Sequence, residues 1–453
     1  MKALSLEWNQ GVAWMNRFND ERSSEMGDFG YIDGIAQEER ISSLSEDQDY
    51  AIDYARNFVD SDDFDSNGHI VIGGVAGSGK SSIIPYIINE VGGTPLTALG
   101  DAGDIAVCAY TGKAVMNLKR KGMPYACTLH SFLYDTRFEN DPVTGGTKVT
   151  HIPRPDFYFK NVKLLVVDEA SMVNREMYEF IESLPFKTIY IGDHFQLPPV
   201  NDDFNIMSNP DIRLERIHRQ NEGNPIVMLA DMARHGKEIP LGIYGSSKVT
   251  RSFHSNDLQK YDEVITWTNS VKDMANDAIR QSKGFQKDVP QIDDKMIVRV
   301  NYKPKNVYNG QIVYLMNHPT LRAGGGWNVE FVDELAYNDP FIMAQTNETT
   351  KAIASIHLPK EELAKFRAMK QNIRSKSDFF MLKKSNPYQI HLDWGYAITC
   401  HAAQGTSWKN VAVLLEDRMQ WVMDRNEMNR WIYTAITRAE ESVTIYEGNF
   451  RNL

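Results

Sequence analysis

The segment Gly74-Val-Ala-Gly-Ser-Gly-Lys80-Ser81 has the GxxxxGK[ST] spacing of a phosphate-binding loop and follows directly on the apolar run Ile70-Val-Ile72. Such a loop closes backbone N–H groups around a phosphate at the positive end of the next helix. Lys80 is expected to reach the β- and γ-phosphates of ATP, and the Ser81 hydroxyl is expected to bind Mg²⁺. The other positions expected at the nucleotide are Gly74, Ala76, Gly77, Ser78 and Gly79. The pattern therefore predicts a site for ATP and Mg²⁺.

Two adjacent carboxylates, Asp168 and Glu169, end the apolar run Leu164-Leu-Val-Val. Because neighbouring side chains diverge at the end of a strand, one carboxylate can hold Mg²⁺ while the other orients the attacking water. We assign the metal to Asp168 and the water to Glu169. Taken alone, such a pair could be an acidic helix N-terminus, but the phosphate-binding loop earlier in the chain favours the catalytic interpretation.

Three further side chains could act on a phosphoryl group in transit. Gln196, in Gly192-Asp-His-Phe-Gln196-Leu-Pro-Pro199, can hydrogen-bond a γ-phosphate without adding charge. Arg219 and Arg438 are isolated arginines, and a guanidinium group stabilises charge on a transferring phosphoryl group. Without that context, each arginine is more simply a surface ion-pair residue, and the glutamine segment is a proline-terminated turn.

Short apolar runs that alternate with helical patterns position these residues. The runs are His69–Ile72, Ile105–Tyr110, Val162–Val167, Thr188–Ile191, Asp262–Trp267, Tyr396–Thr399, Val411–Leu415 and Ser442–Tyr446. Buried strands that alternate with helices indicate parallel sheets. Eight strands in two groups of four predict two α/β domains.

Two segments interrupt this alternation. Asp135–Lys160 contains the turn signal Asp141-Pro-Val-Thr-Gly-Gly146 between β-prone flanks, which predicts a hairpin. Gln291–Lys384 mixes short strands with Asn309-Gly310 and other glycine turns, which predicts an inserted β-rich domain. Residues 1–43 show no clear motif, and we interpret them as an accessory arm.

The composition indicates the setting of this chemistry. The chain has 453 residues, enough for several domains, and its three cysteines, Cys108, Cys127 and Cys400, form no CxxC pair. No apolar run approaches the roughly 18 residues of a membrane span. These features predict a cytoplasmic protein without a membrane partner.

The formal charge of 49 − 60 = −11 argues against a generally basic surface. However, eight acids lie in Glu46–Asp65, whereas Lys113–Lys121 holds four cations and no acid. Because phosphate contacts depend on local Lys and Arg, the net charge does not decide whether nucleic acid is a partner.

Taken together, these segments resemble the superfamily 1 helicases, in the 5′-to-3′ branch that includes the phage Dda helicase and RecD-like enzymes. The resemblance covers residues 44–450 in the expected order. Further segments that carry it are Leu44-Ser-Glu-Asp-Gln48, Tyr110-Thr-Gly-Lys-Ala114, Thr128-Leu-His130-Ser131, Trp267-Thr-Asn269, Gly395–Gly405 and Tyr433–Ala439. One departure is His218, which stands where some relatives have a tyrosine that stacks on adenine, so the base preference is open.

The resemblance implies an α/β fold with two RecA-like P-loop domains, a β-hairpin insert and an SH3-like inserted domain. The expected boundaries are 1–43 for the arm, 44–200 for the first domain with its hairpin at 135–160, 201–290 with 385–453 for the second domain, and 291–384 for the insert.

The resemblance also implies site residues. Gln48 would read the adenine edge, and Gln404 and Gly405 would complete the ATP site. The expected DNA contacts are Thr111, Lys113, Thr128, His130, Thr268, Asn269, Thr399 and His401, which are mostly neutral groups that can hold and release a phosphate backbone. Phe138, near the hairpin turn, is the candidate for an aromatic on a strand-separating pin, although it could equally pack the hairpin against the first domain.

These expectations predict an ATP-dependent DNA helicase, active as a monomer on single-stranded and forked DNA in replication, recombination or repair, beside other proteins of those pathways. A translocase that strips proteins from single strands without opening duplex would share the same motor. A small-molecule phosphotransferase would not need a second, arginine-bearing domain. A non-enzymatic clamp or loader subunit would not need to keep Lys80, Asp168, Glu169 and Arg438.

Overall fold

The computed structural model describes residues 44–61, 68–96, 103–140, 147–199, 204–216, 224–299, 307–322, 326–338, 349–356 and 390–450. The chain divides into two units, Met1–Asp49 and Tyr50–Leu453, and the sheets described below all lie in the second. The expected arm, residues 1–43, lies outside the described residues. Within the described part of the chain, no helix is long and apolar enough to cross a membrane.

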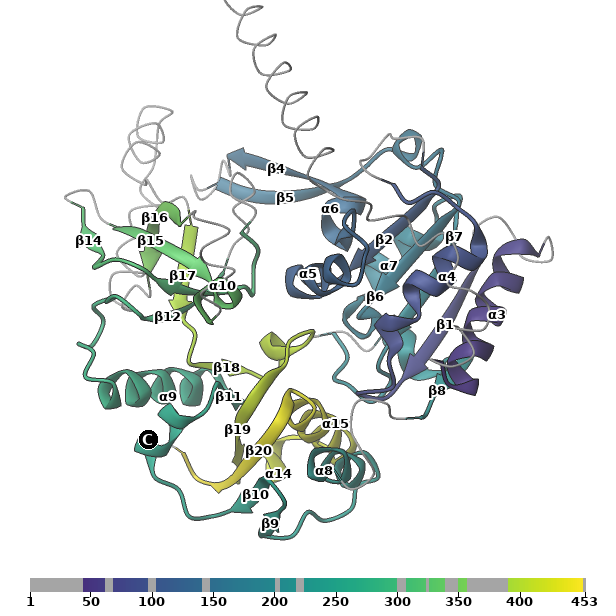
Figure 1. Cartoon of the computed structure of the whole chain (residues 1–453). Helices are drawn as coiled ribbons and strands as arrows, with labels where there is room; N and C mark the ends of the chain where they lie inside the picture. Colours follow the sequence, from purple (N-terminus) through teal and green to yellow (C-terminus); the bar gives the residue numbers. More distant parts are fainter. Residues whose placement is uncertain are drawn as a thin grey trace, which may run out of the picture. The chain divides into compact units, whose positions relative to one another are not determined.

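The first sheet consists of six parallel strands in the order β3-β2-β6-β7-β1-β8 (Figure 1). Its strands are β1 (His69–Gly74), β2 (Ile105–Ala109), β3 (Cys127–Thr128), β6 (Leu164–Asp168), β7 (Lys187–Gly192) and β8 (Ile212–Leu214). The four strands predicted for the first domain are confirmed. The edge strands β3 and β8 were not predicted, because runs of two or three residues carry too little periodicity.

The helices of this region are α3 (Glu46–Asp60), α4 (Ile84–Val91), α5 (Gly112–Arg120), α6 (Leu129–Leu133) and α7 (Arg175–Glu182). Their starts follow from local chemistry, since Thr111, Thr128 and Asn174 each accept a backbone N–H as the N-cap of α5, α6 and α7. Each cap contributes about 1 kcal/mol to helix stability.

The second sheet has the strand order β18-β11-β19-β20-β10-β9 and is parallel except for its last pair. Its strands are β9 (Gly242–Tyr244), β10 (Ser247–Thr250), β11 (Glu263–Thr266), β18 (Ala397–Thr399), β19 (Trp408–Glu416) and β20 (Ala439–Gly448). Its helices are α8 (Pro225–Arg234), α9 (Asn269–Ser282), α14 (Met419–Val422) and α15 (Arg425–Ile436). The four strands predicted for the second domain are confirmed, and the fold contains the two expected RecA-like sheets.

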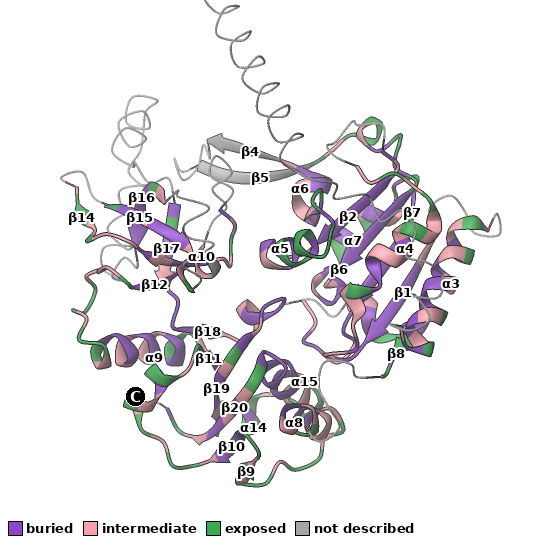
Figure 2. Cartoon of the chain, viewed as in Figure 1, coloured by how far each residue is buried: buried purple, intermediate pink, exposed green. Residues whose placement is uncertain are grey.

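Buried residues run through the central strands of both sheets (Figure 2). In the first sheet, every residue of β2 and β6 is buried, which explains why these strands read as continuous apolar runs. In the second, Trp431 of α15 is fully buried and belongs to a core cluster with strand residues such as Val411 and Val443. α15 is therefore anchored by apolar packing.

The expected β-rich insert is a small closed barrel. It contains β12 (Lys295–Val298), β13 (Ile312–Leu315), β15 (Trp327–Asp333), β16 (Thr350–Ile356) and β17 (Ile390–Trp394), and the pairing of β13 with β15 closes it. β14 (Thr320–Leu321) extends β15, and α10 (Glu334–Asn338) follows β15.

Two expected domain boundaries need correction. The first sheet continues past residue 200, because β8 pairs in parallel with β1. The barrel continues past residue 384, because β17 pairs with β12 and β16 before the chain returns to the second sheet at β18. Both errors arose because pairing between distant strands, rather than local composition, decides which domain a short strand joins.

The predicted hairpin is formed by β4 (Tyr134–Asn140) and β5 (Thr147–Pro153), in antiparallel register with Phe138 opposite Val149. Its turn, 141–146, and the side chain of Phe138 lie outside the described residues. The hairpin ends at Pro153, before the expected Lys160, and Phe159, later in that segment, is fully buried in the core of the first sheet.

Candidate functional site

The phosphate-binding loop lies where the sequence predicts it, directly after β1. Gly77 and Gly79 have φ of 83° and 77°, in the left-handed region that favours glycine. A Cβ on Gly74 would lie 2.5 Å from the Ser78 Oγ, so the loop also needs glycine there for space. Lys80 begins a short 3₁₀ turn, Lys80–Ser82, and the α-helix proper starts at Ile84.

The Lys80 ammonium group lies between the phosphate-binding loop and the residue that follows β7, Asp193. Its Nζ donates to the Val75 carbonyl oxygen at 2.9 Å and lies 3.7 Å from the Asp193 Oδ2. Asp193, which follows β7, is fully buried. The loop lysine is therefore already close to a carboxylate that the sequence did not mark as functional.

The predicted acidic pair lies at the end of β6, the strand between β2 and β7. Burial raises the pKa of Asp168, and a hydrogen bond from Ser81 opposes that shift. Burial also raises the pKa of Glu169, as does the neighbouring charge of Asp168. Glu169 has φ of 56°, an uncommon conformation for a residue other than glycine that is typical of functional sites.

This arrangement fits a divalent cation. Ser81 and Asp168, the two expected metal ligands, are in direct contact, and oxygen ligands of this kind suit Mg²⁺. A cation would add positive charge beside these two buried carboxylates. The Glu169 Oε2 is buried and has no hydrogen-bond partner among the described residues, so it is available to a ligand or water.

The loop after β7 carries Gln196. Its side-chain amide Nε2 donates to the Asp193 Oδ2 at 3.3 Å, and its Oε1 is buried without a partner among the described residues. Because an amide nitrogen has two hydrogens, one donor remains for a phosphate. The structure therefore places Gln196 beside Lys80, by way of their shared neighbour Asp193.

Helix α15, which packs on the second sheet, contacts the loop after β7 along one of its faces. The Arg430 Nη1 donates to the His194 and Gln196 carbonyl oxygens at 2.9 and 3.1 Å. The Leu197 N–H donates to the Thr434 Oγ1 at 3.1 Å. These bonds join a strand loop of the first sheet to a helix more than 230 positions later in the chain.

Arg438 follows α15 and is buried. Its guanidinium group donates to the Thr434 and Thr406 carbonyl oxygens and to the Thr437 Oγ1, each at 3.0 Å. Its charge also lowers the pKa of Glu169. Its action on a transferring phosphoryl group stays a prediction.

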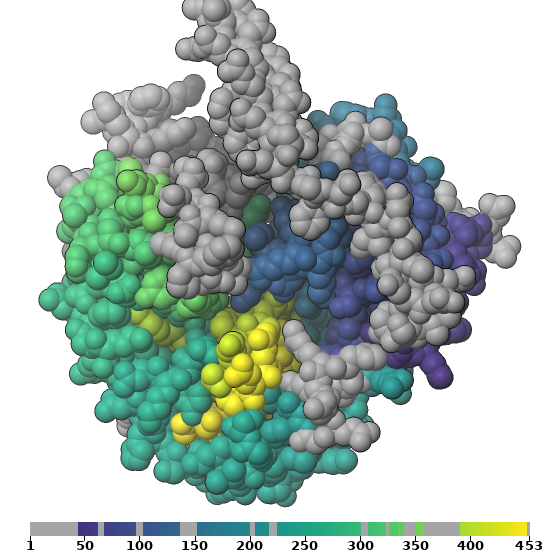
Figure 3. All heavy atoms as spheres, in the orientation of Figure 1, coloured from purple at the N-terminus to yellow at the C-terminus, as the bar shows by residue number. Residues whose placement is uncertain are grey.

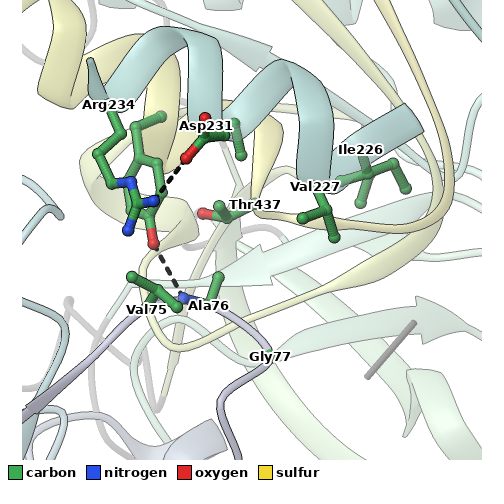
Figure 4. Close-up of a pocket in the computed structure, with 11 residues that line it drawn as sticks. Val75, Ala76, Gly77, Ile226, Val227, Asp231, Arg234 and Thr437 are labelled. Atoms are coloured by element: carbon green, nitrogen blue, oxygen red, sulfur yellow. Dashed lines mark hydrogen bonds and ion pairs between the residues drawn. The ribbon is translucent and has the colours of Figure 1, made fainter. Parts of the chain in front are cut away.

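A hollow of about 500 Å³, partly open to solvent, adjoins the phosphate-binding loop (Figure 4). Val75, Ala76 and Gly77 line one side, and Ile226 and Val227 of α8 line another. Thr437, after α15, also lines it. Elements of both sheets therefore form this pocket.

The remaining residues predicted at the nucleotide have protein contacts of their own. The Gln404 Nε2 donates to the Leu197 carbonyl oxygen at 2.9 Å, so Gln404 touches the loop after β7. Gly405, with φ of 71°, lies against Thr111, whose Oγ1 would be 2.7 Å from a Cβ at that position. The Gln48 Oε1 accepts the Ser45 N–H at 3.1 Å, and its adenine contact stays a prediction. His218 and Arg219 lie outside the described residues.

Three of the predicted DNA-contacting threonines are helix N-caps. Thr111 and Thr128 begin α5 and α6 at the carboxyl ends of β2 and β3, and Thr268 begins α9 just after β11. The Thr268 hydroxyl also contacts Glu416 and Arg418, at 3.0 and 3.1 Å. Because helix N-termini attract phosphate, α5 and α9 place comparable anion-attracting ends on the two sheets.

The remaining predicted DNA residues lie along the same segments. His130 packs edge-on against Tyr110, with ring centroids 5.3 Å apart. Thr399 ends β18, and burial lowers the pKa of His401, which keeps that ring neutral. Asn269, the first residue of α9, is exposed.

Lys113 has protein partners that its predicted role did not include. Its Nζ lies 3.7 Å from the Glu334 Oε2 of α10 and 4.7 Å from the centre of the Trp408 ring. The neighbouring Gly112 packs against Tyr308, where a Cβ would lie 2.5 Å from the Tyr308 Cβ. These contacts join the barrel, green in Figure 3, to the domain of the first sheet, which is purple to blue there. A DNA contact by Lys113 would compete with Glu334 and stays a prediction.

Sequence reasoning missed Asp193, Tyr433, Arg430 and Thr434. The last three are spaced i, i+3 and i+4 on α15, so a helix prediction would have placed them on one face. That spacing alone does not indicate what the face contacts.

The phosphate-binding loop, the acidic pair and an arginine from a second RecA-like sheet define a P-loop nucleoside triphosphatase. The AAA domain family matches residues 61–202, and the UvrD-like helicase C-terminal domain family matches residues 395–446. The chain is similar to superfamily 1 helicases of the branch that includes Pif1, Dda and RecD enzymes.

Individual relatives are distant. The ATP-dependent RecD2 DNA helicase of Deinococcus radiodurans is 23% identical, over 83% of this chain and 46% of its own length. The ATP-dependent DNA helicase dda of Enterobacteria phage T4 is 29% identical, over 37% of this chain and 38% of its own length. This chain thus matches less than half the length of either relative. A crystal structure of Bacteroides Pif1 bound to single-stranded DNA shares the fold, with a TM-score of 0.52, 16% identity and coverage of 88% of this chain and 92% of that one.

Proposed function

We propose that this chain is an ATP-dependent DNA helicase that moves 5′-to-3′ on single-stranded DNA and couples ATP hydrolysis to duplex opening. The observation that carries the proposal is the hydrogen-bonded contact of α15, the helix of the second sheet that Arg438 follows, with the loops after β1 and β7 of the first, through Tyr433 and Thr434. A hydrolytic site shared by two sheets can change their relative position when ATP is bound or cleaved. The direction of movement rests on the family alone.

The hydrolysis step follows from the arrangement of charges. Ser81 and Asp168 would hold Mg²⁺, which neutralises charge on the β- and γ-phosphates when it is bound. Lys80 would contact the same phosphates, and Glu169 would orient water and accept its proton. Arg438 would stabilise the negative charge of the transition state. Gln196, held by Asp193, would detect whether a γ-phosphate is present.

The DNA path is proposed to run over the threonine-capped helix ends. Thr111 at α5 and Thr268 at α9 belong to different sheets, so one strand that contacted both would be held by two bodies. Hydroxyl and N–H contacts to phosphate hold a backbone without reading its sequence. Alternate tightening of the two contacts would move the strand.

DNA-stimulated ATPase, measured beside unwinding of a forked duplex, tests the proposal. We expect single-stranded DNA to accelerate ATP turnover and the fork to be opened only with ATP and Mg²⁺. An ATPase indifferent to DNA would contradict the proposal. DNA-stimulated ATPase without unwinding would favour the second candidate, a translocase that displaces proteins from single strands.

The β4–β5 hairpin is the feature that favours unwinding over translocation alone. We predict that replacing Asn140–Lys148 by a two-residue turn leaves DNA-stimulated ATPase and single-strand movement nearly intact but lowers forked-duplex unwinding at least roughly tenfold. The physical reason is that opening must break base stacking worth about 1.4 kcal/mol per step, which a rigid wedge can couple to movement. Unwinding by the shortened chain at the parent rate would reject the pin.

Phe138→Ala gives a second test of the hairpin. An aromatic that stacks on a base contributes about 1–3 kcal/mol, so loss of unwinding with unchanged thermal stability would support stacking. A lowered thermal midpoint with proportionate loss of every activity would show that Phe138 packs the hairpin.

The affinity for single-stranded DNA should depend only weakly on salt. Among the expected contacts the single lysine, Lys113, is paired with Glu334, so few phosphates would be neutralised by cations. The slope of log affinity against log salt is about −0.7 per neutralised phosphate on single strands. A titration of salt in a fluorescence-anisotropy assay measures it. A slope that corresponds to about eight phosphates or more would reveal an unrecognised basic surface, at Lys113–Lys121 or Lys303–Lys305.

A further inference from the structure

The buried hydroxyl of Tyr433 bridges three segments that the proposed mechanism requires to act together. It accepts the Ala76 N–H of the phosphate-binding loop at 2.9 Å and donates to the Asp193 Oδ2 at 2.9 Å. Tyr433 itself belongs to α15, and only 2% of it is exposed. Figure 4 shows the bond that Ala76 makes in the wall of the pocket.

The acceptor of this hydroxyl, Asp193, is also the carboxylate that faces the Lys80 ammonium group at 3.7 Å. The Asp193 side chain is completely buried, and the Phe195 N–H and the Gln196 Nε2 complete its shell at 3.0 and 3.3 Å. When phosphate draws Lys80 away from a buried carboxylate, the remaining donors must hold that charge. The Tyr433 hydroxyl is the donor that comes from the other sheet.

The same helix ends beside Arg438. Arg438 donates to the Thr434 carbonyl oxygen, one residue after Tyr433, so the guanidinium group and the hydroxyl are set on one rigid turn. A shift of the tyrosine along the helix axis would therefore displace the arginine. Displacements of about 1 Å at a reacting centre can cost roughly 10²-fold in rate.

We infer that Tyr433 is a positioning residue that couples the Lys80–Asp193 pair to the Arg438 helix, so that phosphate bound at one sheet places the arginine of the other. This inference rests on the proposed nucleotide hydrolysis but not on DNA unwinding. In this inference Tyr433 acts through Asp193, Ala76 and Arg438 rather than on the reacting atoms.

Tyr433→Phe removes the hydroxyl and keeps the ring, which packs edge-on against Phe195 with centroids 5.9 Å apart. We expect kcat for ATP to fall roughly tenfold while KM changes less than about threefold, because the arginine acts mainly on the transition state. The matched control is Tyr446→Phe, whose hydroxyl lies 2.9 Å from the Tyr261 hydroxyl, away from the nucleotide site. The control should retain the parent kcat.

A double-mutant cycle separates coupling from packing. If Tyr433 acts through Arg438, adding Tyr433→Phe to Arg438→Ala should lower kcat by no more than about twofold further. A tyrosine with only a structural role would instead give multiplicative losses and would overturn the inference. A Tyr433→Phe variant with the same kcat as the parent chain would also overturn the inference.

Thermal shifts with nucleotide test the coupling independently of DNA. With Mg²⁺ present, we expect the slowly hydrolysed analogue ATPγS to stabilise the parent chain more than ADP does, because the γ-phosphate engages Arg438. The difference in thermal midpoint between the ATPγS-bound and ADP-bound chain is called the ATPγS excess. The variants Tyr433→Phe and Arg438→Ala should both lose this excess. A parent chain without the excess, or a Tyr433→Phe variant that keeps it, would contradict the inference. An intact excess in a chain without DNA-stimulated turnover would sink the helicase proposal and leave this one standing.

A second variant guards against misfolding of the first. Asp193→Asn keeps the shape and an acceptor oxygen but removes the charge that faces Lys80. We expect the same loss of the ATPγS excess, with a far-UV circular dichroism spectrum like that of the parent. An Asp193→Asn chain with the full excess would show that the carboxylate does not transmit phosphate binding.

Discussion

The Glu169→Gln variant should bind Mg²⁺–ATP at least as tightly as the parent but hydrolyse it about 10²–10⁴-fold more slowly. An amide can hold the attacking water but cannot accept its proton. Binding should survive because the proposed metal ligands are Ser81 and Asp168, which the substitution leaves in contact. It should also relieve repulsion, since the charges of Asp168 and Asp193 both raise the pKa of Glu169.

Nucleotide affinity and single-turnover hydrolysis, measured on one preparation, test this expectation. Glu179→Gln, an exposed glutamate on α7, is the matched control and should match the parent in both. Loss of binding with unchanged turnover per bound ATP would move the metal role from Asp168 to Glu169. Unchanged binding and turnover together would remove Glu169 from the mechanism.

The Lys80→Ala variant should lose at least about 10²–10³-fold in ATP turnover, because a positive group aimed at phosphate is removed. The structure adds a second consequence. Asp193 is fully buried and Lys80 is a cation beside it, at 3.7 Å, so the truncation removes a neighbouring positive charge from that carboxylate. The fold should persist, because Tyr433, Phe195 and Gln196 still donate to Asp193.

Steady-state ATPase with and without single-stranded DNA measures the loss, and a thermal melt checks the fold. The control is Lys163→Ala, which removes an exposed lysine that pairs with Asp104 at 3.1 Å on the surface. Such a surface pair contributes about 0–1 kcal/mol, so its loss should leave turnover unchanged. Parent turnover in Lys80→Ala would refute the phosphate-binding assignment.

Much of the motor was predictable because its parts are local. The phosphate-binding loop needs glycine at Gly77 and Gly79 for positive φ, and at Gly74 for space, so its pattern survives in any context. The buried strands are short apolar runs bounded by turns, and all eight predicted runs are strands of the two sheets. Asp168 and Glu169 could be placed because a strand end fixes where adjacent side chains diverge.

The inserted barrel was predictable only in outline. Its β-rich composition identified it, but its limits depend on which distant strands pair. β17 joins the barrel through β12 and β16, and β18 joins the second sheet three residues later. No long loop marks that transfer, because only Gly395 and Tyr396 separate the two short strands.

The sequence by itself therefore determined the chemical groups of this protein: a phosphate-binding loop, an acidic pair and an arginine on a helical segment. The tertiary structure alone decided their neighbours. Tyr433 meets Ala76 and Asp193 across more than 230 positions of chain, and Lys113 meets Glu334 of the barrel. Periodicity and spacing report contacts within one element, whereas these contacts depend on how separate elements pack, so their residues carry no local signal.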